Sequence, residues 1–225
     1  MRIFFLGTGA ADWKAADHRE WVGYRRNASV LIDNVLLIDP GPCVPDALAT
    51  FGKDAKGIRY ILNTHRHKDH YSFDTFACLQ GAAFHPLKAG EAVQLGRYRV
   101  TALAANHGTS CGGAVHFLIT DGEKTLFYGL DGAWLLYTEV AAIKEARPDL
   151  AVLDATVGEA LGDYRVFEHN DLAMVRLLKA ALAPYVKRFC ISHMARTLHT
   201  SHEALVADMA RDGIEVAFDG LEIEI

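Results

Sequence analysis

Cysteine is scarce in this chain. Its 225 residues include four cysteines, and no two of them stand in a C-x-x-C pair. This scatter argues against a disulfide framework and against a cysteine zinc knuckle, and it predicts a protein of the reducing cytoplasm. The four residues are Cys43, Cys78, Cys111 and Cys190.

Long apolar runs and a large excess of one charge are also missing. No run approaches the roughly 18 apolar residues of a membrane helix, and the apolar start is too short for a signal peptide. The formal net charge of −5 gives no general attraction to nucleic acid or to anionic membranes. We therefore expect a small-molecule partner and no membrane association. The pair Arg25-Arg26 is the local basic feature that keeps nucleic acid in consideration.

No low-complexity tract, linker or internal repeat divides the sequence, so residues 1–225 are predicted to form a single domain. Short apolar runs typical of strands fill the first two-thirds, and Asp33-Asn34 and Asp121-Gly122 are predicted as hairpin turns. A final strand is predicted at residues 215–225. Many antiparallel strands with interspersed helices indicate two sheets between helical layers.

Apolar residues at helical spacing predict four helices. Asn170 is the predicted cap of the third helix, and Thr200 with Glu203 forms a predicted capping box at the start of the fourth. The predicted helices cover residues 70–80, 134–146, 171–182 and 201–212.

What the chain does contain is a dense cluster of metal-ligand side chains. The run NTHRHKDH, residues 63–70, follows an apolar strand at residues 58–62. In an extended loop His65 and His67 point the same way, whereas Asp69 and His70 follow after a turn and can face a second ion. Imidazole nitrogen and carboxylate oxygen suit Zn²⁺ without any sulfur, although ligand type alone also admits Mn²⁺ or Fe²⁺.

Two ions need more donors than this run supplies, and three further positions fit. His107, Asp131 and His193 each follow an apolar run that reads as a strand. Side chains at such strand ends collect on one rim of a sheet. His199 and His202 lie close enough to His193 in the sequence to be alternatives to it.

These motifs, in this order, resemble the metallo-β-lactamase fold superfamily. The likeness includes the run H-x-H-x-D-H, a later His, the Asp that closes a Y-x-G-x-D strand end, and a final S-H. It also includes residues 6–9 and 37–41. The resemblance implies the α+β class: an αββα four-layer sandwich of two mixed β-sheets flanked by helices, with two metals at one edge. It assigns His65, His67 and His107 to one ion, Asp69, His70 and His193 to the other, and Asp131 to both.

Within the superfamily the chain is most similar to the phosphodiesterase branch, which contains tRNA 3′-processing endonucleases and phosphoribosyl cyclic phosphodiesterases. That branch has an extra histidine between the bridging Asp and the last His ligand, and here His169 stands in that place. Two features of particular members are missing: an insertion long enough for a tRNA-gripping arm, and a cysteine cluster before Cys43. The family also implies a homodimer.

The resulting prediction is a binuclear metal-dependent hydrolase with two divalent ions, Zn²⁺ first among them. It is expected to cleave a small, perhaps cyclic, nucleotide or sugar phosphodiester through a hydroxide shared by the metals. His169 and Asp69 are the predicted catalytic residues, Asp69 also as a metal ligand. One alternative keeps the site and hydrolyses a lactone, thioester or β-lactam carbonyl. Another is a binding protein without turnover.

Two smaller questions stay open at this point. Asp39, at a strand end before Pro40-Gly41, is either a partner that orients a ligating imidazole or a simple turn residue. His116, within an apolar strand, is interpreted as a satisfied core or surface side chain.

Overall fold

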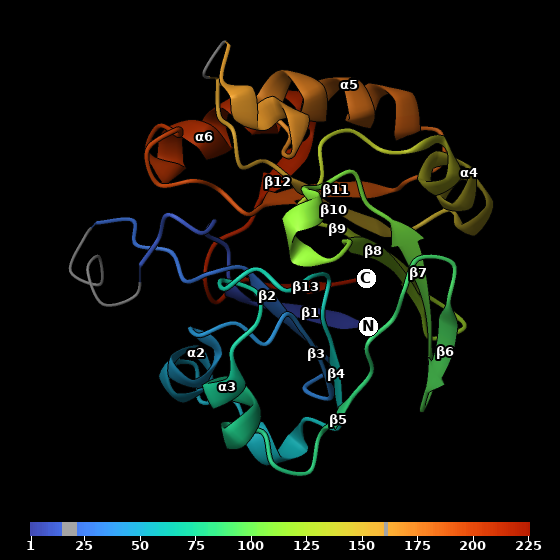
Figure 1. The fold of residues 1–225 in the computed structure, drawn as a ribbon. Coiled ribbons are helices and arrows are strands. Elements are labelled where there is room, and N and C mark those ends of the chain that lie inside the picture. Colours follow the sequence, from blue (N-terminus) through green and yellow to red (C-terminus); the bar gives the residue numbers. More distant parts are fainter. Residues whose placement is uncertain (15–21, 160–161) are drawn as a thin grey trace.

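In the computed structural model, which describes residues 1–14, 22–159 and 162–225, the strands form two mixed sheets (Figure 1). The first sheet has antiparallel pairs on one side and parallel pairs from β3 onward. Its strand order is β13 (Glu222–Glu224), β1 (Arg2–Gly7), β2 (Ser29–Ile32), β3 (Leu36–Ile38), β4 (Tyr60–Leu62) and β5 (Ala83–Phe84).

The second sheet is parallel from β12 to β9 and antiparallel from β9 to β6. Its order is β12 (Ile214–Val216), β11 (Arg188–Ser192), β10 (Leu150–Asp154), β9 (Thr125–Gly129), β8 (Val115–Thr120), β7 (Tyr98–Ala104) and β6 (Ala92–Leu95). The parallel part decides where the site lies, because β9, β10 and β11 end at the same edge.

Helices cover the outer face of each sheet, as Figure 1 shows. On the first sheet lie α2 (Val44–Thr50) and α3 (Phe73–Cys78), and on the second α4 (Tyr137–Ala146), α5 (Leu172–Leu182) and α6 (His202–Met209). Single turns of 3-10 helix occur at η1 (Ala55–Gly57), η2 (Thr109–Cys111), η3 (Tyr164–Phe167) and η4 (Ala210–Asp212).

Three separate apolar clusters fill the spaces between these four layers. The largest joins the facing sides of the two sheets, for example Phe5 with Phe117 and Tyr128. A second lies between the second sheet and its helices, and a third between the first sheet and α2 and α3. Burial on both faces explains why central strands such as β3 and β10 are apolar almost throughout, whereas β7 and the edge strand β13 alternate. The predicted αββα sandwich of two mixed sheets is confirmed.

The two predicted hairpin turns are present. Asp33 and Asn34 both have positive φ, 49° and 58°, as a two-residue turn between β2 and β3 requires. The predicted strand at residues 215–225 is wrong. The chain there forms β12 in one sheet, turns at Gly220 with φ 94°, and enters the other sheet as β13.

The helix starts differ from the predicted caps. The cap of α5 is Asp171, whose carboxylate accepts from the Met174 amide at 2.7 Å, whereas Asn170 turns inward. The cap of α6 is Ser201 and not Thr200. The third and fourth helices are therefore present with starts shifted by one residue. Across the described residues, no helix is both long and apolar enough to cross a membrane.

Candidate metal centre

The predicted site residues meet at the edge where the parallel strands of the second sheet end. β9 leads into Asp131 and β11 into His193, while His65 follows β4 of the other sheet. Leu153 of β10 pairs with Gly129 of β9, and Asp154 of β10 pairs with Ser192 of β11. The strands β9, β10 and β11 therefore end at the same level. This register brings together donors that are up to 128 positions apart in the sequence, from His65 to His193.

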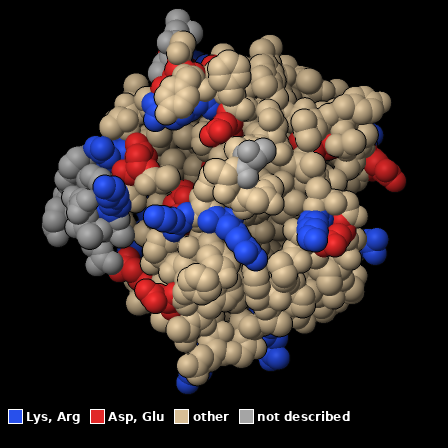
Figure 2. Space-filling model, viewed as in Figure 1, with Lys and Arg blue, Asp and Glu red and all other residues tan. Residues whose placement is uncertain are grey.

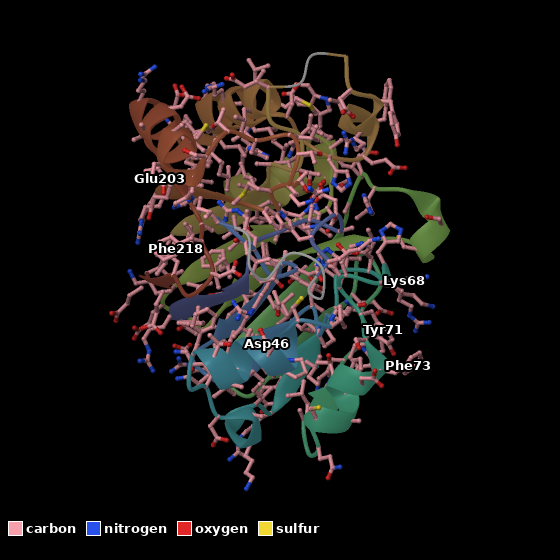
Figure 3. The ribbon with its side chains drawn as sticks, turned by 90° about the vertical axis from the view of Figure 1, so that its left-hand side faces the viewer. Asp46, Lys68, Tyr71, Phe73, Glu203 and Phe218 are labelled. Atoms are coloured by element: carbon pink, nitrogen blue, oxygen red, sulfur yellow. The ribbon has the colours of Figure 1, made fainter. Side chains whose placement is uncertain are left out.

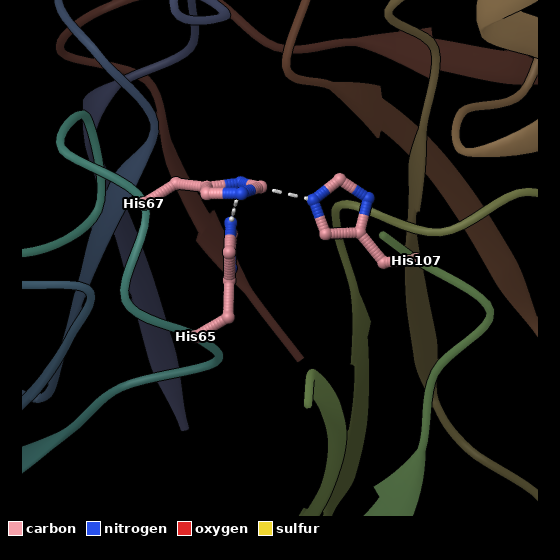
Figure 4. A group of neighbouring side chains, drawn as sticks. All are labelled: His65, His67 and His107. Atoms are coloured by element: carbon pink, nitrogen blue, oxygen red, sulfur yellow. Dashed lines mark hydrogen bonds between the residues drawn. The ribbon is translucent and has the colours of Figure 1, made fainter. Parts of the chain in front are cut away.

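Three imidazole nitrogens converge on one point in Figure 4. His67 Nδ1 lies 3.0 Å from His65 Nε2 and 3.1 Å from His107 Nε2. His107 Nδ1 lies 3.2 Å from the Glu168 carbonyl oxygen, which can only accept, so His107 carries its hydrogen there and directs a lone pair inward.

The outer nitrogens of the other two rings also have partners. The Thr64 hydroxyl lies 2.9 Å and 3.1 Å from the two Asp39 oxygens and donates to that carboxylate, so it accepts from His65 Nδ1 at 3.0 Å. His67 Nε2 contacts the Ser110 hydroxyl at 3.2 Å. His65 and His107 carry their hydrogens on their outer nitrogens, so both direct lone pairs toward His67 Nδ1, which can donate to at most one of them. A cation between the three nitrogens stabilises this arrangement.

A second group adjoins the first. His70 Nε2 lies 3.1 Å from His193 Nε2, 3.2 Å from Asp69 Oδ2 and 2.6 Å from Asp131 Oδ2. Asp131 Oδ2 is nevertheless buried without a hydrogen-bond partner among the described residues. An anionic oxygen in this position needs a positive charge, which a metal ion between the donors would supply.

Asp131 is the residue that the two groups share. Its carboxylate belongs to a set with His65 and His70 in which the ligand atoms lie within 4.8 Å of one another, and to another with His193. Asp131 and His193 have φ of 58° and 62°, and Asp39 has φ of 61°. Three left-handed non-glycine residues at one site indicate backbone strain held by the surrounding contacts.

The electrostatics of the buried side chains also fit cations. Burial lowers the pKa of His193, but Asp131, Asp154 and Asp69 outweigh burial and raise this pKa to about 10. Burial raises the pKa of Asp131, yet His193 and His70 keep it well below its usual range. Burial and His70 lower the pKa of His65 to about 2. Asp131 is therefore anionic and His65 neutral, the forms that bind divalent ions, and a cation bound here would displace the proton of His193 and replace its positive charge.

A pocket of about 480 Å³ opens over this centre. Small apolar side chains and a charged rim line it, in addition to the converging histidines: Ala10, Ala11 and Ala195, and Asp12, Lys68, Arg165 and Glu168. In Figure 3 Lys68 lies on the same side of the molecule as Tyr71 and Phe73, away from Phe218.

Comparison with known proteins agrees with this geometry. Residues 22–73, which contain the H-x-H-x-D-H run, match the family model described as the metallo-beta-lactamase superfamily. A diphosphatase of the PhnP family is 19% identical, with a TM-score of 0.74 over 100% of this chain and 98% of that one. The chain has the metallo-β-lactamase fold.

Two further solved structures are similar to this chain over its whole length. Zn²⁺-bound PqqB from Methylobacterium extorquens is 17% identical with a TM-score of 0.77, over 100% of both chains. The short form of human tRNase Z is 16% identical with a TM-score of 0.71, over 100% of this chain and 99% of that one. Among curated protein sequences no match is found. The resemblance to the superfamily predicted from the sequence is confirmed.

The contacts of Asp39 show whether it orients a ligating imidazole or only shapes a turn of the metallo-β-lactamase fold. It is fully buried, and its Oδ2 lies 2.9 Å from His70 Nδ1. Its Oδ1 accepts from the Thr64 amide at 2.7 Å and the Asn63 side chain at 3.0 Å. Asp39 therefore both shapes the turn and orients the His70 ring, so the two interpretations hold together.

Asp39→Asn is expected to weaken metal binding by about 10- to 100-fold, because an amide cannot accept from His70 and Thr64 as the carboxylate does. Competition with a chromogenic chelator measures the affinity. Asp46→Asn on α2, whose carboxylate accepts from Arg26, is the matched control; Figure 3 labels Asp46. Equal affinities of the two variants would show that Asp39 does not orient His70.

Asp154 is a buried site residue that sequence reasoning missed. Its Oδ2 lies 3.2 Å from His169 Nδ1 and 2.9 Å from the Thr156 hydroxyl, and accepts from the Asp131 amide at 3.2 Å. The Thr156 hydroxyl in turn lies 2.6 Å from His193 Nδ1. The signal was available, because Asp154 ends the apolar run of residues 150–154 just as Asp131 and His193 follow theirs.

Two nearby histidines have other roles. His199 Nε2 donates to the Ala155 carbonyl at 2.7 Å, and His202 Nδ1 faces Arg25 at 3.0 Å. Neither belongs to a group of metal-ligand atoms in the part of the chain that is described. His193 is therefore the residue that joins the converging donors after β11.

Proposed function

We propose that the protein is a binuclear metal-dependent phosphodiesterase that acts on a small nucleotide or sugar phosphodiester. The ligands would be His65, His67, Asp69, His70, His107, Asp131 and His193, with Zn²⁺ as the first candidate metal. Two bound divalent cations supply Lewis acidity toward phosphoryl oxygens and lower the pKa of a coordinated water to about 7.

The observation that supports a phosphodiester substrate is the placement of His169. Its Nδ1 lies 3.2 Å from Asp154 Oδ2 and 3.1 Å from the Thr156 hydroxyl, so Nε2 is the nitrogen left for the pocket. Burial lowers the pKa of His169, but Asp154 and Asp131 outweigh burial and raise it. An imidazole held in this way can deliver a proton to a leaving alkoxide, which phosphodiester cleavage requires.

The pocket supports a small substrate. Its volume of about 480 Å³ lies in the range of small-molecule sites. On the face shown in Figure 2, basic and acidic side chains are interspersed and form no continuous basic surface. Lys68 and Arg165 at the rim can still attract a phosphate group. Two structural neighbours, a diphosphatase and tRNase Z, are consistent with phosphorus chemistry.

A substrate panel tests this proposal. Protein loaded with Zn²⁺ or Mn²⁺ is expected to hydrolyse bis-p-nitrophenyl phosphate, with little action on a lactone or a thioester. Treatment with a chelator should abolish the activity, and added metal should restore it. Rapid hydrolysis of the lactone or thioester, with the phosphodiester untouched, would instead identify a carbonyl hydrolase with the same centre. Full metal loading without any turnover would contradict both.

A further inference from the structure

A buried ionisable pair lies behind the metal centre and takes no direct part in it. His116 of β8 and Glu139 of α4 are 1% and 0% exposed, and their Nδ1 and Oε1 atoms are 2.6 Å apart. The other oxygen of Glu139, Oε2, accepts from the Leu136 amide at 2.8 Å. A pair buried this completely costs desolvation energy, so it calls for a reason beyond core packing.

The pair contacts both ends of the segment 131–136, which begins with Asp131. At its far end the Leu136 amide donates to Glu139. At its near end the His116 ring lies against Gly132: a Cβ added to this glycine would come within 2.6 Å of His116 Cε1 and 2.8 Å of Nε2. His116 Nε2 is itself buried with no hydrogen-bond partner in the described part of the structure.

This segment also connects two other parts of the centre. The Ala133 amide donates to the Asn106 carbonyl and the Asn106 side chain donates to the Ala133 carbonyl, both at 2.9 Å. The Trp134 amide donates to Asn170 Oδ1 at 2.7 Å. Asn106 precedes His107 and Asn170 follows His169, so a shift of the segment would reach both histidines.

The backbone of the segment needs such support. Asp131 and Trp134 both have φ of 58°, in the left-handed region that non-glycine residues rarely adopt. Strained residues keep this conformation only when their surroundings fix it. The contacts of Glu139 with Leu136 and of His116 with Gly132 provide this on the side away from the pocket.

We propose that His116 and Glu139 are positioning residues, which hold the segment 131–136 so that Asp131 faces both groups of metal-ligand side chains. The inference rests on the cation site of the proposed function but not on its substrate. It is therefore tested by metal binding, so that a failure of phosphodiesterase activity would leave it standing.

The contact between His116 and Gly132 permits a double-mutant cycle on the full-length protein loaded with Co²⁺. Gly132→Ala places its methyl group against the His116 ring. We expect this variant to change the visible absorption of bound Co²⁺ and to bind Co²⁺ about 10-fold more weakly, a loss within the range for residues that support a metal ligand. In a His116→Ala background the ring is absent, so Gly132→Ala should then change Co²⁺ binding by less than about twofold. An equal effect of Gly132→Ala in both backgrounds would overturn the proposal.

Glu139→Gln tests the pair from its other side. A glutamine oxygen can take the place of only one of the two carboxylate oxygens, so the side chain either loses the Leu136 amide or turns its NH2 group toward His116. Both outcomes remove the anionic partner of His116, so the Co²⁺ spectrum is expected to change. Asp33→Asn is the matched control, because Asp33 also accepts from two side chains and an amide, Arg97, Tyr98 and Arg2, at a distant hairpin. The Asp33→Asn variant should have a lower melting temperature and an unchanged Co²⁺ spectrum.

A Glu139→Gln protein with a lower melting temperature but an unchanged Co²⁺ spectrum would show that the pair of His116 and Glu139 is merely structural. Should Glu139→Gln not fold, the cycle at residues 116 and 132 still decides.

Discussion

Asp131→Asn is expected to lose both metal ions and to lower turnover by about 10³-fold or more, since bound metals contribute several kcal/mol of transition-state stabilisation. Asparagine is chosen because it has nearly the volume of aspartate and tolerates the left-handed backbone that Asp131 adopts at φ 58°. The change therefore removes the charge and leaves the turn intact. Asp131 Oδ2 is 2.6 Å from His70 Nε2 and 3.2 Å from His193 Nε2, so an amide in its place would lose the anionic donor at the centre of the site.

Metal content of the purified protein, measured by mass spectrometry of the elements, checks this prediction together with turnover. Asp149→Asn is the matched control: Asp149 is 8% exposed and accepts from the Thr125 amide and from Lys187, at the opposite end of the same sheet. This variant should lose some thermal stability and keep its metals. An Asp131→Asn protein with two ions per chain would rule out a bridging role for Asp131.

The donors could be predicted from the sequence because their placement follows from strand ends. The run of residues 63–70 is local, so its donors are close in space whatever the fold. Asp131 and His193 are distant in sequence, yet parallel strands that end level must bring the residues after them together. The same reasoning applies to Asp154, which is the last residue of β10 and does not follow its strand as Asp131 and His193 follow theirs.

Other features depend on contacts that no local pattern carries. The two short strands β12 and β13 appear as one strand in the sequence, because the turn between them is fixed by Asp219, which bonds to Thr8 at 2.8 Å across 211 positions. The α2 helix has no side-chain cap at its start and was not predicted. His116 was interpreted as a satisfied core or surface side chain. Its partner Glu139 stands on a helix 23 positions away, and only the packing of that helix on the sheet brings them together.

His169→Ala is expected to keep both metals and to lower turnover by about 10²- to 10⁴-fold, the usual range for the loss of a general acid or base. The His169 ring packs against His107 and His193, with ring centroids 5.1 Å and 5.6 Å away, and its Nδ1 is held by Asp154 and Thr156. The hydrogen bonds that orient those two ligand rings come from the Glu168 carbonyl and the Thr156 hydroxyl instead. Alanine therefore removes the Nε2 nitrogen that faces the pocket and leaves the seven predicted ligands in place. Turnover and metal content, measured on the same sample, separate the two effects.

The choice of substrate makes this test specific for proton delivery. A p-nitrophenolate leaves without a proton, whereas an alkoxide needs one, so the loss in His169→Ala should be much larger for an alkyl phosphodiester than for bis-p-nitrophenyl phosphate. His85→Ala, at the end of β5, is the control histidine and should change neither rate. An equal loss on both substrates would assign His169 to substrate binding or orientation. An unchanged rate at full metal content would remove His169 from the chemistry. The dependence on the leaving group follows from the geometry, because a ring anchored through Nδ1 has only Nε2 with which to reach the leaving oxygen.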